Sequence, residues 1–209
     1  MSNERVNIRV GSVPEHFMTP WHLGMEDDSF HQSGIHIEWK DFPGGTGAMS
    51  KALEEDRADV CILLTEGIIK AIAEGNPSHV ISGYIVSPII WGIHTGFKNS
   101  LNSSKDIFDK RFAISRYGSG SHLIPQVDAL THEANIDPGQ FTVVNDVEGA
   151  LMSLAALETD VFYWEKYTTQ PFVDSGQLRR IGEFITPWPC FVIAARDAFI
   201  KEHPESLKK

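Results

Sequence analysis

Three short segments combine glycine with hydroxyl-bearing residues at points where a helix is expected to begin. They are residues 44–47, 65–67 and 118–121, and each follows a strand-like segment. Ligands of open α/β sheets bind beyond the carboxyl ends of the strands, and a helix N-terminus offers unpaired N–H donors with a partial positive charge. The pattern therefore predicts that a polar or anionic group binds at these segments. The candidate ligand-binding residues are Gly45, Thr46, Thr65, Ser119, Gly120 and Ser121.

None of these segments matches a nucleotide-binding motif. Residues 44–47 lack the lysine of a P-loop, and no G-x-G-x-x-G follows the first expected strand. Ordinary turns and helix caps are the alternative interpretation of each segment taken alone. Three such segments at matching strand ends favour a binding site over that alternative.

Four charged or ionisable residues lie at similar places. Glu15 and His16 follow the first expected strand and could hydrogen-bond a ligand or act as an acid/base pair, the alternative being a solvated loop. Glu66 and Glu165 lie just beyond two apolar strands. A pair of acids could serve a glycosidase-like reaction, although recognition of an amino group is the simpler hypothesis. The further alternative is that helix-start acids are favoured by the macrodipole.

Tryptophans also lie near expected strand ends. Core packing is the default role for each of the four, Trp21, Trp91, Trp164 and Trp188. Trp91 and Trp188 differ because they lie where the chain is expected to pass between two lobes. Two prolines flank Trp188 and restrict the backbone there. We therefore expect these aromatic side chains to form the floor of a ligand cleft between the lobes.

The elements that must position these residues alternate between short apolar strands and helical stretches. This pattern predicts an α/β fold with mostly parallel sheets. The expected strands are residues 6–10, 35–40, 60–64, 80–93 (as one or two strands), 112–115, 141–144, 161–164, 178–184 and 191–195. The main expected helices are residues 19–30, 147–157 and those that begin at residues 44–47, 65 and 118–121.

The two halves of the chain resemble each other weakly. In each half a helix with a Gly-Ala pair leads through an Asp-Val turn into an apolar strand, at Asp59-Val60 and at Asp160-Val161. Because the spacings differ slightly, the pattern indicates two similar lobes rather than a true repeat. We expect lobe I to comprise residues 1–91 plus 190–209 and lobe II to comprise residues 92–189.

Composition excludes several classes of protein. Among the 209 residues, 28 acids outnumber 18 bases, giving a net charge of −10, which disfavours nucleic acid as a partner. Apolar stretches such as residues 68–73 are much shorter than the roughly 20 residues of a membrane span, so no membrane insertion is expected. Cys61 and Cys190 lie in apolar runs and are predicted to be buried free thiols. No spacing of Cys and His indicates a metal site.

The sequence resembles the type II periplasmic-binding-protein fold, in particular the nitrate/sulfonate/bicarbonate-type solute-binding proteins of ABC transporters. Thiamine-pyrimidine precursor synthases belong to the same superfamily. The matching stretches are spread over most of the chain. They are residues 45–47, 52–53 and 59–60, residues 115–121 and 129–130, residues 148–150, 160–161 and 164–165, and Phe199 with residues 203–205. The resemblance implies two α/β lobes, joined by two crossovers, that close on a small ligand, with an ABC-type permease as a candidate partner.

The sequence departs from the family pattern in three ways. Members normally continue beyond the segment that ends here at Lys209. The N-terminus shows no apolar signal-peptide core, so the chain as given is expected to be cytoplasmic, or extracytoplasmic if a leader was removed. Precursor synthases carry a lysine for pyridoxal phosphate just after the strand that corresponds to residues 60–64, where this sequence has Thr65 and Glu66, and their cysteine-rich segment is reduced to Cys190. No cofactor is therefore expected.

The first hypothesis is a non-catalytic solute-binding protein. The alternative is a cytosolic enzyme of the precursor synthase type that acts on a small heterocycle, with His16 or Glu66 as acid/base; a regulatory ligand-sensing domain is a third hypothesis. Helix N-termini favour an anionic group, whereas Glu66 and Glu165 favour a donor or cation. The expected ligand is therefore small and polar: an amino-substituted heterocycle, an amino acid or a sulfonate-like molecule.

Overall fold

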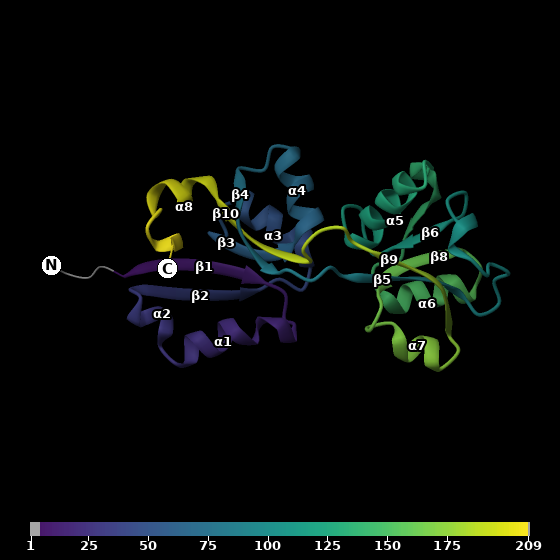
Figure 1. Cartoon of the computed structure of the whole chain (residues 1–209), viewed down its shortest axis with the longest axis horizontal. Helices are drawn as coiled ribbons and strands as arrows, with labels where there is room; N and C mark the ends of the chain where they lie inside the picture. Colours follow the sequence, from purple (N-terminus) through teal and green to yellow (C-terminus); the bar gives the residue numbers. More distant parts are fainter. Residues whose placement is uncertain (1–4, 209) are drawn as a thin grey trace. The chain divides into compact units, whose positions relative to one another are not determined.

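The computed structural model describes residues 5–208, which form two compact units. Unit 1 comprises the chain up to Val86 and from Pro189 onward, and unit 2 comprises Ser87–Trp188. In Figure 1, unit 1 runs from purple to blue and includes the yellow C-terminal part, whereas unit 2 is teal to green. Each unit has its own five-stranded sheet. The sequence-based lobe boundaries stay a prediction.

The sheet of unit 1 has the strand order β2-β1-β3-β10-β4. Its strands are β1 (Val6–Ser12), β2 (Ile35–Asp41), β3 (Val60–Leu64), β4 (Ser78–Ile85) and β10 (Phe191–Arg196). Strand β1 pairs in parallel with β2 and β3, whereas β10 pairs antiparallel with both β3 and β4. Strand β3 is therefore central and almost entirely buried.

Helices pack on this sheet through short apolar faces. They are α1 (Thr19–Glu26), α2 (Ser29–Gln32), α3 (Gly45–Glu54), α4 (Thr65–Ala73) and α8 (Asp197–Glu202). Met49 and Leu53 of α3 and Ile68 of α4 are fully buried in one cluster with residues of β3. Cys61 belongs to that cluster, and both cysteines are buried free thiols, as the sequence predicts.

The sheet of unit 2 has the order β7-β6-β8-β5-β9. Its strands are β5 (Ile90–Gly96), β6 (Phe112–Ile114), β7 (Phe141–Val143), β8 (Val161–Glu165) and β9 (Leu178–Ile185). Strand β6 pairs in parallel with β7 and β8, and β5 pairs antiparallel with β8 and β9. The hydrogen-bonding pattern therefore repeats that of unit 1, strand for strand.

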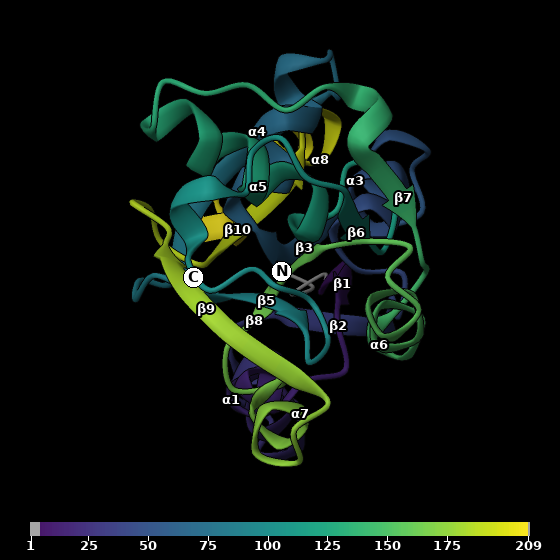
Figure 2. The ribbon, with the colours of Figure 1, turned by 90° about the vertical axis from the view of Figure 1, so that its right-hand side faces the viewer.

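Three helices accompany this sheet: α5 (Gly120–Thr131), α6 (Val147–Ala155) and α7 (Gln170–Asp174). The side chain of Asp146 caps α6 by accepting from the Gly149 N–H at 2.8 Å, as expected. Helix α7 lies at one end of β9 (Figure 2). Short 3-10 helices are His16–Met18, Ser104–Asp106, Pro138–Gln140 and Ser206–Lys208. No helix within residues 5–208 is long and apolar enough to cross a membrane.

Two expectations about the elements are wrong. The sheets are mixed rather than mostly parallel, because β10 and β5 each run antiparallel to both neighbours. The helix expected at residues 19–30 is two helices, because Asp28 adopts a left-handed conformation at φ 61° and the Asp27 carboxylate accepts from the Ser29 N–H at 3.0 Å. Helices α7 and α8 were not expected, since five and six residues carry little periodicity.

The aspartates of the two similar Asp-Val turns each pair with an arginine. The Asp59 Oδ2 atom accepts from the backbone N–H and the Nε–H of Arg9, both at 2.9 Å. The Asp160 Oδ2 atom accepts from the same two groups of Arg111, at 3.1 and 2.8 Å. In both units the aspartate N–H donates back to the arginine carbonyl at 2.8 Å. Each pair thus joins the amino end of one strand, β3 or β8, to the parallel strand beside it.

Candidate functional site

The first turn of α5 is held by three buried serines at the carboxyl end of β6. The Ser119 hydroxyl donates to the Arg116 carbonyl at 2.7 Å and lies 2.9 Å from the Ser121 hydroxyl. The Ser121 oxygen in turn accepts from the Ser115 N–H at 2.9 Å. Farther along α5, the Tyr163 hydroxyl of β8 donates to Asp128 at 2.6 Å. The predicted residues Ser119 and Ser121 therefore fix the direction in which this turn points its N–H groups.

Several donors at this turn have no acceptor in the described part of the chain. They include the N–H groups of Gly120 and Ser121 and the buried indole N–H of Trp91. Gly120 is required here, since an added Cβ atom would lie 2.3 Å from Cη2 of Trp91. Buried donors in proteins are normally paired. The predicted residues Trp91, Gly120 and Ser121 are thus brought together around unsatisfied donors.

Arg116 adds a positive charge in the loop that leads to this turn. Its side chain is solvent-accessible, and partial burial lowers its pKa, with no carboxylate of residues 5–208 acting on it. An arginine nevertheless stays protonated at any physiological pH. Sequence reasoning missed this residue, although its place between a strand end and the Ser-Gly-Ser turn was a usable signal. The α5 turn is therefore an electropositive group of donors, suited to an anion.

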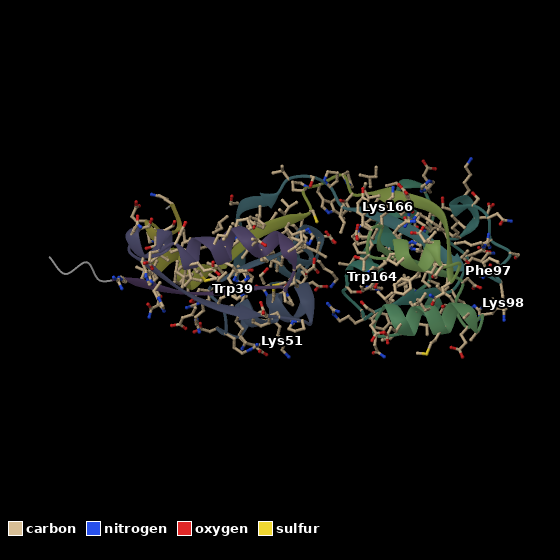
Figure 3. All side chains as sticks on the ribbon, turned by 90° about the horizontal axis from the view of Figure 1, so that it is seen from below. Trp39, Lys51, Phe97, Lys98, Trp164 and Lys166 are labelled. Carbon is tan, nitrogen blue, oxygen red and sulfur yellow. The ribbon has the colours of Figure 1, made fainter. Side chains whose placement is uncertain are left out.

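The other candidates of unit 2 have local partners. The Glu165 carboxylate accepts from the backbone N–H groups of Tyr167 at 2.9 Å and Thr168 at 2.7 Å, and from the Thr168 hydroxyl at 2.8 Å. It therefore shapes the turn after β8. Trp164 precedes it in the sequence and stacks on Phe162 at a centroid distance of 5.3 Å. Figure 3 labels Trp164 and Lys166, both of unit 2.

Trp188 and Trp91 share one hydrophobic cluster of unit 2. Trp91 is a buried member of that cluster, and Trp188 packs against it while partly buried. Core packing, the default interpretation of the sequence, thus describes much of both side chains. A contact of either residue with a ligand stays a prediction, as it does for Trp164 and Glu165.

In unit 1 the predicted hydroxyls join elements of the fold. The buried Thr46 Oγ1 accepts from the Leu64 N–H at 3.2 Å, and the Thr65 hydroxyl donates to the Pro189 carbonyl at 2.5 Å. Gly45 opens α3 with φ 65°, a conformation that favours glycine. Glu66 is half-buried in the first turn of α4. A carboxylate is favoured there by the helix dipole and disfavours an anion beside it.

Glu15 and His16 lie on the surface of the loop after β1. Both side chains are exposed, and Glu15 makes no side-chain cap of the following 3-10 helix. The His16 ring meets the ring of Phe17 edge-on at 5.6 Å. These two residues therefore lie at the surface, a few residues beyond the carboxyl end of β1. Their contact with a ligand stays a prediction.

Aromatic residues also lie near these strand ends, and of them only Trp21 was predicted from the sequence. We call Phe17, Trp21, Tyr84 and Phe191 the aromatic edge. The rings of Phe17 and Phe191 lie 4.4 Å apart, and those of Trp21 and Tyr84 lie 6.5 Å apart. Because Tyr84 and Phe191 are distant in the sequence from Phe17 and Trp21, no local sequence pattern could have grouped all four.

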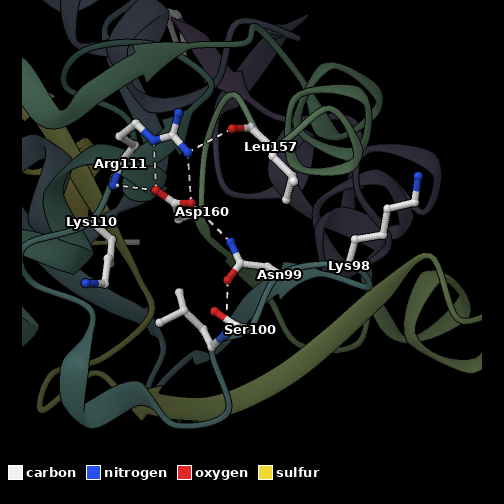
Figure 4. Close-up of a pocket in the computed structure, with 8 residues that line it drawn as sticks. Lys98, Asn99, Ser100, Lys110, Arg111, Leu157 and Asp160 are labelled. Atoms are coloured by element: carbon white, nitrogen blue, oxygen red, sulfur yellow. Dashed lines mark hydrogen bonds and ion pairs between the residues drawn. The ribbon is translucent and has the colours of Figure 1, made fainter.

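A hollow of unit 2 lies at the amino ends of β6 and β8, and no residue of the α5 turn lines it. Its volume is about 340 Å³, and it surrounds the Arg111–Asp160 pair (Figure 4). The Asp160 oxygens already accept from Arg111 and from the Asn99 amide. Lys98 also lines the hollow but points away from the pair (Figure 4). The polar groups here mainly serve the pairing of two strands.

Residues 5–208 contain no group of three or more His, Cys, Asp or Glu residues that could hold a metal ion. Burial lowers the pKa of His94 to about 4. This histidine lies 3.2 Å from the Phe162 carbonyl through Nδ1 and 2.9 Å from the Thr169 hydroxyl through Nε2. It is a neutral residue of the core of unit 2.

Comparison with known proteins identifies the fold. Residues 91–184 match the family model described as Ca3427-like PBP, and no curated protein matches the chain. The Candida albicans CA3427 gene product, described as having the generic periplasmic binding protein fold, is 28% identical with a TM-score of 0.87, over 97% of this chain and 67% of that one. The chain thus spans about two thirds of that protein's length.

More distant structures share the same fold. The aliphatic sulphonate binding protein SsuA of Escherichia coli is 15% identical with a TM-score of 0.72, over 97% of this chain and 69% of that one. PhnD1 of Prochlorococcus marinus, solved with methylphosphonate, is 12% identical with a TM-score of 0.65, over 99% and 81%. The predicted resemblance to the type II periplasmic-binding-protein-like superfamily and its α/β fold is confirmed.

Proposed function

We propose that this chain is a non-catalytic solute-binding protein whose unit 2 binds the anionic group of a small sulfonate- or phosphonate-like molecule. The fold supports a solute-binding role, because structural neighbours include a sulphonate-binding protein and a protein solved with methylphosphonate. Closure of two lobes on the solute belongs to this proposal as the movement typical of such proteins. An ABC-type permease is the partner that the proposal implies.

The first turn of α5 is the observation that carries the proposal. The N–H groups of Gly120 and Ser121 have no acceptor among residues 5–208, and Arg116 lies four residues before the helix. A tetrahedral oxyanion presents three oxygens, which can accept from two backbone donors and a guanidinium together. Charge-assisted hydrogen bonds of this kind are the stronger ones in proteins.

The structure also bears on the expected ligand types. The Glu165 carboxylate accepts three hydrogen bonds from its own turn, so it has less capacity left for an amino group of a solute. This favours the sulfonate-like ligand over an amino acid. The precursor synthase alternative is not favoured, because Thr65 and Glu66 follow β3 at the place where that resemblance would need a lysine.

Isothermal titration calorimetry with methanesulfonate and methylphosphonate tests the proposal. We expect at least one probe to bind, and Arg116→Ala to weaken that binding about tenfold or more, the effect of losing a hydrogen bond between charged groups. Arg57→Ala, which removes an exposed arginine of unit 1, is the matched control and should leave the affinity unchanged. If neither probe binds, or if both variants weaken binding equally, the proposal is wrong.

A further inference from the structure

The loop between β6 and α5 carries Arg116 and is hydrogen-bonded to the first turn of α5 at both of its ends. At its start, the Ser115 N–H donates to the Ser121 hydroxyl oxygen at 2.9 Å. At its end, the Gly118 N–H donates to the Nδ1 atom of His122 at 3.0 Å. Both acceptors belong to the turn whose N–H groups the proposed function assigns to the anion. His122 is thus the second of two side chains that tie this loop to the site.

The hydrogen bond from Gly118 determines which ring nitrogen of His122 carries the proton. Because Nδ1 accepts from an N–H group, it is unprotonated, and the proton of the neutral ring belongs to Nε2. Nε2 faces the side-chain amide of Gln126 at 3.2 Å, and that amide also donates to the His122 carbonyl at 2.8 Å. Gln126 therefore supports His122 from the next turn of the same helix.

Two aromatic rings hold the imidazole of His122 from the other elements around it. The ring of Tyr117, in the loop, meets it edge-on at a centroid distance of 5.1 Å. The ring of Phe141, the first residue of β7, meets it edge-on at 4.7 Å. The side chain of His122 is half-buried between them. These contacts keep the ring in the position from which Nδ1 reaches Gly118.

The conformation of the loop depends on such contacts, because neither a helix nor a strand includes it. Gly118 adopts φ 78°, in the left-handed region that favours glycine. The Arg116 carbonyl accepts from the N–H and the hydroxyl of Ser119, at 3.2 and 2.7 Å. Only burial shifts the pKa of the Arg116 guanidinium, so no carboxylate of residues 5–208 holds that side chain. The backbone of the loop therefore decides where the guanidinium can lie.

We propose that His122 is a positioning residue of the anion site: through Nδ1 it holds the Gly118 N–H and thereby keeps Arg116 in place to bind the anionic group. This inference rests on the proposed function, which assigns Arg116 and the first turn of α5 to that group. A loop that is already ordered loses less conformational entropy when the solute binds. His122 thus acts on the affinity without touching the anion itself.

Isothermal titration calorimetry with methanesulfonate and methylphosphonate tests this inference on two variants of His122. His122→Leu leaves the Gly118 N–H without its acceptor and should weaken binding about fivefold, the effect of losing an ordinary hydrogen bond. His122→Asn offers its Oδ1 atom in place of Nδ1 and should restore the affinity to within about twofold of the unaltered protein. His22→Leu, at an exposed histidine of α1, is the control and should leave the affinity unchanged.

A double-mutant cycle shows whether His122 acts through Arg116. In the Arg116→Ala background, His122→Leu should cause no further loss of affinity, because the group that it positions is already gone. If His122→Leu leaves the affinity of the unaltered protein unchanged, or weakens binding equally in both backgrounds, the inference is wrong and the proposed function stands. If neither probe binds the unaltered protein, the proposed function is wrong and this inference fails with it.

The ¹⁵N NMR signals of the His122 ring give a measurement that needs no variant, should His122→Leu fail to fold. At pH 8, where an ordinary histidine is neutral, we expect Nε2 to be protonated and Nδ1 to be unprotonated. A proton on Nδ1 would leave the Gly118 N–H without an acceptor in this ring and would overturn the inference.

Discussion

The two units share one arrangement of strands but carry different residues at the carboxyl ends of those strands. Their sheets have the corresponding orders β2-β1-β3-β10-β4 and β7-β6-β8-β5-β9, with the fourth strand antiparallel in each. At the amino ends of β3 and β8, Arg9–Asp59 and Arg111–Asp160 make the same backbone and Nε hydrogen bonds. At the carboxyl ends, unit 1 presents the aromatic edge and unit 2 presents the α5 turn with Arg116.

This comparison separates the groups that serve the fold from those suited to a ligand. The arginine–aspartate pairs recur because both sheets need the same connection between parallel strands. The carboxyl ends are free to differ, since loops and helix starts there are not required for strand pairing. Residues that differ between corresponding places of the two units are therefore the better candidates for binding.

The largest expected effect on stability is that of removing the aspartate of an arginine–aspartate pair. Burial alone would raise the pKa of Asp59, but hydrogen bonds from Arg9 and Arg196 outweigh it and hold the pKa below its usual value. The Asp59 side chain is 5% exposed and the Asp160 side chain 16% exposed. Asp59→Ala should lower the free energy of unfolding of unit 1 by about 3–5 kcal/mol, because it leaves two arginines without their buried partner.

Asp160→Ala should cost unit 2 less, about 1.5–3 kcal/mol, since a single arginine loses its partner. Urea unfolding, followed by hydrogen exchange in each unit, measures both variants. Arg196 is a further partner of Asp59, to which it donates at 2.9 Å. Equal losses of unfolding free energy in the two variants would show that Arg196 adds nothing to the stability of unit 1.

The second largest effect should be a difference between the two units in how their stability depends on pH. His94 pairs with Phe162 of β8, and at the corresponding place in unit 1 Ala194 pairs with Cys61 of β3. Burial lowers the pKa of His94 from 6.5 to about 4. Below pH 6.5, His94 of the unfolded chain therefore binds a proton, whereas His94 of the folded chain stays neutral until the pH approaches 4. Unit 2 should lose about 3 kcal/mol as the pH falls from 7 to 4.

Hydrogen exchange at pH 7 and at pH 4 measures this loss, which should be concentrated in unit 2. His94→Gln should flatten the pH dependence over that range, at some cost in stability at pH 7. His22→Gln, in an exposed residue of α1, is the matched control. A pH dependence that survives His94→Gln would assign the acid sensitivity to other groups.

The smallest expected effect concerns Glu165. Its carboxylate accepts from Tyr167 and Thr168 in its own turn, so Glu165→Gln should change methanesulfonate affinity less than about twofold. It should lower stability by about 1 kcal/mol, the net value of an ordinary hydrogen bond. A tenfold loss of affinity for taurine, an amino sulfonate, would instead support the amino-group recognition that the sequence suggested.

Most strands and helix starts could be predicted because their signals are local. Alternating apolar residues predicted β2, and Asp146 predicted the start of α6. The antiparallel placement of β5 and β10 could not be predicted, since it depends on pairing between distant segments. Trp21 was expected near a strand end, but its grouping with Phe17, Tyr84 and Phe191 was missed for the same reason. Arg116 was missed because a single charge after a strand is also typical of a solvated loop.

The central claim is that the first turn of α5 binds the anionic group, and an NMR titration tests it most directly. Amide and indole resonances of the ¹⁵N-labelled protein are followed as methanesulfonate is added. The account predicts that the largest shifts belong to the N–H groups of Gly120 and Ser121 and the indole N–H of Trp91. Shifts centred instead on Lys98 and Arg111, which line the hollow at the amino ends of β6 and β8, would contradict it.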